Sequence, residues 1–228
     1  MRNFFKKWSW FEITWLVLFS ATAIALSLIW GDTLFSLSVF FTGVVCVVLV
    51  AKGSIWNYAW GTYNVIGYSW LSWQNGFFGE VTLNAGYFLP MQLVGWLMWK
   101  NKMHGVEVEM KRQNLQQMVL WFGGATIITF AYGFILSHIP EQNSPYLDAS
   151  STVLSVLAMI LMARRYAEQW IYWIVIDAVS VIMWAMRFNS GVEGSMAMLV
   201  MWSAYLVNAI YGYIKWLQNS TVETKAKF

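Results

Sequence analysis

Charged side chains are scarce in this sequence. Only 11% of its 228 residues are Asp, Glu, Lys or Arg, whereas 59% are hydrophobic; an ordinary soluble domain carries roughly a quarter charged residues. So few charges could not cover the surface of a soluble fold of this size, but a surface that faces lipid does not need them. The composition therefore predicts an integral membrane protein.

Residues suited to catalysis or metal binding are also few. The single cysteine, Cys46, allows neither an intrachain disulfide nor a cysteine zinc site, and the two histidines, His104 and His138, fall in or beside connecting segments. The sequence shows no Ser–His–carboxylate set, acidic dyad or glycine-rich phosphate loop. The net charge of +3 does not suggest a nucleic-acid partner. We expect no enzymatic activity, no cofactor and no metal.

Long apolar segments dominate what is present. A membrane-spanning helix needs about 20 mostly apolar residues, and in lipid such segments must be helical to pair their backbone groups. The candidate spans cover approximately residues 10–30, 34–51, 55–72, 76–100, 114–137, 146–163, 168–188 and 193–217. The first is too long for a signal-peptide core, so we interpret it as a retained helix. The sequence thus predicts an all-α integral membrane fold with eight transmembrane helices.

The basic residues indicate an orientation. If the spans alternate in direction, all 14 Lys and Arg residues except Arg187 fall on one side. The positive-inside rule places that side, and with it both termini, in the cytoplasm. Tryptophans near span ends predict an interfacial belt; they are Trp8, Trp10, Trp30, Trp56, Trp73, Trp99, Trp170 and Trp216.

Two parts of the chain resemble each other. The run Tyr87-x-x-Pro90-x-x-x-x-Gly95-x-x-x-Trp99 is similar to Tyr205-x-x-Asn208-x-x-x-Gly212-x-x-x-Trp216. Each run would close a block of three helices, and a linking helix between the blocks would make them parallel, as in some transporters with a central substrate site. The expected divisions are an N-terminal tail and extra helix (1–33), a first bundle (34–100), a cytoplasmic loop and linking helix (101–145), a second bundle (146–217) and a cytoplasmic tail (218–228).

Polar residues at membrane depth are candidates for function, because burying them in lipid is costly. Trp173, Asp177, Ser180 and Trp184 are spaced 4, 3 and 4 residues apart, which places them on one helical face. This stripe suits a ligand with a flat ring and hydroxyl groups, and aromatic faces also attract cations. A structural aspartate bonded to neighbouring helices is the alternative.

Amide and tyrosine side chains supply further candidates, which are Asn84, Tyr87, Gln92, Tyr205 and Asn208. Each could contact a ligand or form a structural hydrogen bond between helices. One face of the third span carries Asn57, Gly61, Asn64 and Tyr68. We interpret that face as helix packing, because the glycine permits close approach.

Two longer motifs combine these residues. The first reads Trp56-Asn57-Tyr58…Gly61…Asn64…Tyr68…Gln74…Gly79-Glu80…Asn84…Tyr87…Gly95-Trp96…Trp99. The second reads Glu168-Gln169-Trp170-x-x-Trp173-Ile174-x-x-Asp177, followed by Tyr205…Gly212-Tyr213…Trp216. Taken together, the two motifs resemble the PnuC family of bacterial nicotinamide riboside transporters over roughly residues 34–217.

The resemblance implies a SWEET-like 3+1+3 core of two parallel three-helix bundles, a homotrimer and a place in the bacterial inner membrane. It also implies facilitated diffusion of nicotinamide riboside, a form of vitamin B3, by alternating access. A cytoplasmic nicotinamide riboside kinase would make uptake directional. Because the substrate combines a pyridinium cation, a carboxamide and a ribose, we expect contacts from Trp184, Asn208, Gln92, Asn84, Tyr87, Tyr205, Asp177 and Trp173.

Other functions remain open at this stage. The chain could carry another small solute, such as a sugar or a different vitamin. It could also be a vitamin-binding subunit that needs a separate ATP-driven module, docked for instance through the small-residue face of Ala21 and Ala25. A membrane enzyme is disfavoured because the catalytic residues are missing.

Overall fold

The computed structural model describes residues 8–30, 33–74, 78–138, 145–190 and 195–222. Within them the chain forms eight long helical segments, one for each predicted span, which confirms the all-α prediction. These segments are α1 (Trp10–Trp30), α2 (Leu34–Lys52), α3 (Asn57–Gln74), α4 (Phe78–Leu83) continuing through the π-helical η2 (Asn84–Phe88) into α5 (Leu89–Lys100), α6 (Leu115–Leu136), α7 (Pro145–Ala163), α8 (Gln169–Asn189) and α9 (Ser195–Asn219).

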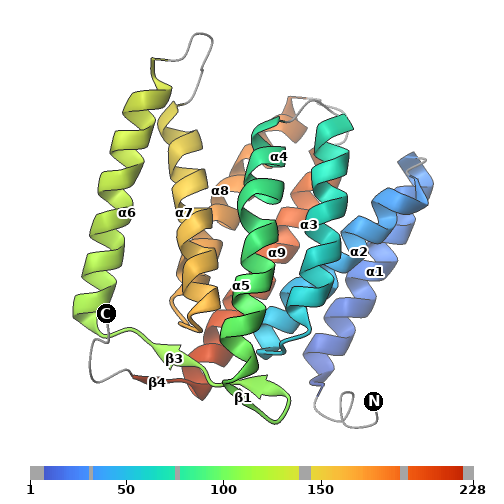
Figure 1. Cartoon of the computed structure of the whole chain (residues 1–228). Coiled ribbons are helices and arrows are strands. Elements are labelled where there is room, and N and C mark those ends of the chain that lie inside the picture. The colour runs from blue at the N-terminus through green and yellow to red at the C-terminus, as the bar shows by residue number, and fades with distance from the viewer. Residues whose placement is uncertain (1–7, 31–32, 75–77, 139–144, 191–194, 223–228) are drawn as a thin grey trace.

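Short strands gather at one end of the helical bundle, which we call the strand end (Figure 1). There β1 (Met103–His104) pairs antiparallel with β2 (Glu107–Val108), and β3 (Lys111–Arg112) pairs in parallel with β4 (Thr221–Val222). The Nε atom of Arg112 donates a hydrogen bond of 2.9 Å to the Ser220 hydroxyl. The connection between α5 and α6 is thereby tied to the residues that follow α9.

The helices pack as a bundle with α1 and α6 at opposite edges (Figure 1). Inside the bundle α8 lies against α7 and α9, and α2 lies against α3 and α9, while α1 packs on α2 and α6 packs on α7. By length and apolar composition alone, α2 and α6 could each cross a membrane, with mean hydropathies of 2.6 and 1.8. Apolar side chains on α6 are strongly exposed, as at Leu115 and Ile127.

The fourth span changes its helical pitch where Pro90 enters. Proline has no N–H and its ring crowds the carbonyl four residues earlier, so a regular α-helix cannot pass through it unaltered. The chain responds with the π-helical turn η2, in which the N–H of Leu89 bonds to the carbonyl of Asn84. Such turns are frequent at functional sites, and here the turn begins at a predicted ligand-contacting residue.

The same turn follows α2 and α7. After α2, Gly53 takes a left-handed conformation with φ of 72°, and its N–H and that of Ser54 bond back to the ends of the helix. After α7, Arg165 takes φ of 69° and Arg165 and Tyr166 repeat this pattern. A left-handed non-glycine residue is uncommon, so the repetition at Arg165 indicates that this turn is held by its surroundings.

The predicted tryptophan belt is wrong for three of its members. Trp99, Trp170 and Trp216 are buried in one aromatic cluster at the strand end, with Trp99 and Trp216 0% exposed. Trp10 and Trp73 are exposed, as a belt requires. Position near a span end could not separate these cases, because the buried tryptophans lie on faces that point into the bundle.

Candidate functional site

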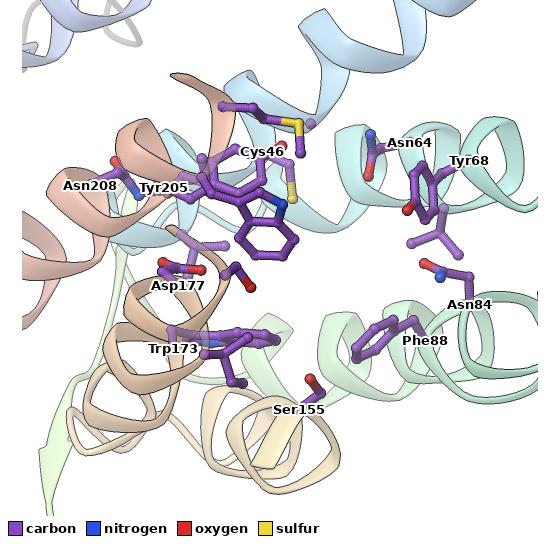
Figure 2. Close-up of a pocket in the computed structure, with 18 of the residues that line it drawn as sticks. Cys46, Asn64, Tyr68, Asn84, Phe88, Ser155, Trp173, Asp177, Tyr205 and Asn208 are labelled. Carbon is purple, nitrogen blue, oxygen red and sulfur yellow. Dashed lines mark hydrogen bonds between the residues drawn. The ribbon is translucent and has the colours of Figure 1, made fainter. Parts of the chain in front are cut away.

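A cavity of about 640 Å³ lies inside the bundle. Its lining comes from α2, α3, α4, η2, α5, α7, α8 and α9, and therefore from both of the predicted three-helix blocks. Figure 2 shows Asp177, Tyr205 and Asn208 toward one end of the cavity, with Asn64 and Asn84 toward the other. The space is thus bounded by polar groups that come from opposite halves of the chain.

Most residues predicted to contact a ligand line this cavity; they are Asn84, Gln92, Trp173, Asp177, Tyr205 and Asn208. Ser180 of the predicted stripe on α8 also lines it. The side chain of Trp184, the last member of the stripe, lies outside what the structure describes. The spacing of Trp173, Asp177 and Ser180 therefore predicted a face of α8 that lines the cavity.

Asp177 is the acidic residue of the site. Its side chain is only 5% exposed, and the cavity lining as described contains no Lys, Arg, His or second acidic residue. Among the described residues it forms neither a salt bridge nor a hydrogen bond. A buried carboxylate without a partner is costly, so this position fits a cationic ligand or a ligand that donates hydrogen bonds.

Several polar atoms at the cavity have no partner within the described part of the chain. They are the Oε1 atom of Gln92 and the indole nitrogens of Trp170 and Trp202, all buried. Because most buried polar atoms in native structures are hydrogen-bonded, these three atoms are exceptions that the described protein groups do not satisfy. Asn208 uses one amide N–H on the Val47 carbonyl at 3.2 Å.

Tyr87 is placed differently from the other candidates. It is not among the residues that line the cavity, and its hydroxyl donates a 2.8 Å hydrogen bond to the carbonyl of Val156 on α7. This bond joins the π-helical turn of the first predicted block to the first helix of the second. A role for Tyr87 in ligand contact remains a prediction.

Residues that the sequence interpretation assigned to packing also reach the cavity. On α3, Asn57 is structural and bonds to the Ser54 carbonyl, but Asn64 and Tyr68 line the cavity. Cys46 on α2 lines it as well. The four-residue spacing of Asn64 and Tyr68 was the available signal. The amide of Asn64 also donates to the Val39 carbonyl on α2 at 2.8 Å, so this residue both packs against α2 and lines the cavity.

Two tryptophans close the cavity at the strand end by reciprocal contacts. Trp99 on α5 donates its indole N–H to the carbonyl of Met162 at the end of α7, at 3.0 Å. Trp216 on α9 donates to the carbonyls of Val50 and Ala51 at the end of α2, at 3.2 Å each. Because Val50 and Met162 are themselves lining residues, the cavity ends at this pair.

Known proteins resemble this chain over most of its length. Residues 33–218 match the family model described as nicotinamide mononucleotide transporter. The chain is 34% identical to the nicotinamide riboside transporter PnuC of Neisseria mucosa, with 94% of this chain and 84% of the relative covered. It is 32% identical to that of Haemophilus influenzae, with 94% and 93% covered.

A solved structure shares the fold. The crystal structure of the vitamin B3 transporter PnuC superposes with a TM-score of 0.81 at 33% sequence identity, covering 95% of this chain and 94% of that chain. The family match, the two relatives and the superposition all extend over nearly the whole helical bundle and its cavity. The chain therefore belongs to the PnuC family.

Proposed function

We propose that this chain is a membrane transporter that moves nicotinamide riboside by facilitated diffusion. The observation that carries the proposal is the composition of the cavity: one buried carboxylate, several aromatic rings and several amides, without a basic residue among the described lining. Membership of the PnuC family supports the same conclusion, since the relatives named above are nicotinamide riboside transporters.

The chemistry of the substrate matches these groups. Nicotinamide riboside carries a permanent positive charge on a flat pyridinium ring, which aromatic faces attract. Trp173, whose ring lies beside Asp177 in Figure 2, is placed to contact such a ring. Gln92, Asn84 and Asn208 can pair with the carboxamide and the ribose hydroxyls. We propose that the positive charge of the pyridinium ring is neutralised by Asp177, the acidic residue of the described lining.

The same composition distinguishes the nucleoside from the nucleotide. A phosphate group would need an arginine or lysine partner, which the described cavity lining lacks, and it would also meet the carboxylate of Asp177. Two like charges about 5 Å apart repel by about 3 kcal/mol at an effective dielectric constant of about 20. We therefore assign nicotinamide riboside, and not nicotinamide mononucleotide, as the substrate.

We place the bundle in the bacterial inner membrane with eight spans and both termini in the cytoplasm. Support comes from the exposed apolar side chains of α6, whose Phe122 is 66% exposed, since such a surface suits lipid. Lys52, Lys100 and Lys111 all lie at the strand end, where α1 begins. The positive-inside rule makes this end cytoplasmic.

Transport would follow from relative motion of two three-helix blocks, α2 to α5 and α7 to α9, with α6 as the linking helix of a SWEET-like core. The matching turns after α2 and α7 and the reciprocal bonds of Trp99 and Trp216 support this division. Phosphorylation of the imported nucleoside by a cytoplasmic kinase would make uptake directional. We also propose the homotrimer that the family resemblance implies.

Uptake by the purified chain alone tests this function. Proteoliposomes that contain only this protein should accumulate radiolabelled nicotinamide riboside to the external concentration, without ATP and without an ion gradient. Uptake that occurs only when an ATP-driven module is added would instead identify a binding subunit. Uptake of glucose but not of nicotinamide riboside would identify a carrier of another solute.

A further inference from the structure

A buried carboxylate on α1 connects the two proposed blocks at the strand end. Glu12 is 1% exposed and accepts hydrogen bonds from Lys52 at the end of α2, at 3.0 Å, and from Lys215 near the end of α9, at 2.7 Å. The hydroxyl of Tyr211 on α9 donates to the same carboxylate at 3.2 Å. Each oxygen of Glu12 thus contacts a different block.

The local sequence fixes Glu12 in this position. Ser9 and Glu12 form a reciprocal cap at the start of α1, in which the Ser9 hydroxyl accepts the N–H of Glu12 at 3.1 Å and the carboxylate accepts the N–H of Ser9 at 2.9 Å. This S-x-x-E arrangement is a capping box. The ring of Phe11 packs 4.3 Å from that of Tyr211, so α1 is held against α9 as well as α2.

The cluster of Glu12, Lys52 and Lys215 lies next to the strand end of the cavity. The indole of Trp216 donates to the carbonyls of Val50 and Ala51, and these hydrogen bonds close the strand end of the cavity. Lys52 directly follows Ala51 on α2, and Lys215 directly precedes Trp216 on α9. Glu12 therefore bridges the same two helices immediately beyond that closure. The cavity cannot open between α2 and α9 while both lysines remain bonded to one carboxylate.

We propose that Glu12 is a latch that holds α2 and α9 together and limits opening of the cavity toward the strand end. Two ammonium groups share one buried carboxylate, and the ring of Trp8 lies 4.8 Å from the Lys52 ammonium, so separation of the helices leaves at least one buried charge without its counter-charge. The latch lies in α1, before the region that the family model matches. This inference rests on the proposed transport function, because it concerns access to the transport cavity.

Cys46 gives a direct readout of access. It is the single cysteine of the chain and lines the cavity, so a cationic, membrane-impermeant methanethiosulfonate reagent added to one side of sealed vesicles reports entry from that side. In Glu12→Gln, labelling from the cytoplasmic side should be about tenfold faster, which corresponds to losing one charge-assisted hydrogen bond from the closed state. Labelling from the opposite side should not accelerate.

Glu109→Gln is the matched control. Glu109 also pairs with a basic residue at the strand end, Arg165 at 3.1 Å, but it is more exposed and its carboxylate does not bridge α2 and α9. Its labelling rate should stay within about twofold of the unsubstituted protein, as expected for a surface pair. Equal labelling in Glu12→Gln and Glu109→Gln would overturn the latch, and so would acceleration from both sides, because that indicates general loosening.

A second variant keeps the test valid if Glu12→Gln does not fold. Lys215→Met removes the ammonium that ties Glu12 to α9 and leaves the carboxylate paired with Lys52, so no buried charge loses its counter-charge. This variant should show the same one-sided acceleration, and its absence would refute the latch. Slower labelling of Cys46 when nicotinamide riboside is present, measured on the unsubstituted protein, tests the proposed function separately. Failure of the latch can therefore be distinguished from failure of the proposed function.

Discussion

Replacing Asp177 by Asn should weaken binding of nicotinamide riboside while leaving the shape of the cavity unchanged. Asp177 is the acidic residue of the described cavity lining and is 5% exposed. A pyridinium charge about 4 to 5 Å away would gain about 3 to 4 kcal/mol at an effective dielectric constant of about 20. Desolvation of the carboxylate offsets part of this gain, so we expect a net loss of about 2 to 3 kcal/mol, or about 30- to 150-fold in Kd.

Calorimetry on purified protein measures this effect, and a second ligand isolates the charge. Reduced nicotinamide riboside has nearly the same shape but no positive charge, so its affinity should change much less in Asp177→Asn. Ser180→Ala, on the same face of α8, is the control for a lost polar group without a lost charge. The charge assignment is wrong if Asp177→Asn binds the cationic ligand within about twofold of the unsubstituted protein, or if both ligands lose affinity equally.

Four further substitutions test the site and the packing around it. Trp184→Ala and Asn208→Ala should each weaken nicotinamide riboside binding by about 1–3 kcal/mol if the side chain contacts the ligand, and unchanged affinity in folded protein rejects that contact. Gly95→Ala should lower the thermal unfolding temperature, because a Cβ there would lie 2.3 Å from the ring of Tyr58; Gly123→Ala on α6, which meets nothing within 4 Å, should not lower it, and equal unfolding temperatures would refute the packing argument.

The sequence was informative about the helices because a helix that crosses lipid must follow a simple rule. Each span needs a long apolar run, and the runs could be located from composition alone. The break in the fourth span was less visible. Pro90 is in the sequence, but the π-helical turn that it causes and the resulting direction of Asn84 depend on how the backbone recovers its hydrogen bonds.

The candidate site was predictable where the helical spacing was regular. On α8, the spacing of Trp173, Asp177 and Ser180 identified a face that lines the cavity. On α3, the spacing of Asn64 and Tyr68 was equally regular, yet the sequence could not tell a face packed on α2 from one beside an open space. That distinction depends on long-range packing, which one sequence does not contain.

The buried tryptophans show the same limit. Trp99 and Trp216 were equivalent members of the sequence repeat. In the structure Trp99 on α5 bonds to the end of α7, and Trp216 on α9 bonds to the end of α2. A tryptophan near the end of a span is usually interfacial, and only the arrangement of α2, α5, α7 and α9 reveals which ones face inward. The role of Glu12 was invisible for the same reason, since its partners lie in distant helices.

Affinities of nicotinamide riboside and nicotinamide mononucleotide for the same purified protein test the central claim most directly. We predict measurable binding of the nucleoside and at least about 100-fold weaker binding of the nucleotide, since like-charge repulsion at Asp177 of about 3 kcal/mol adds to the absence of a basic partner in the described lining. Equal or tighter binding of the nucleotide would contradict both the assigned substrate and the role given to Asp177.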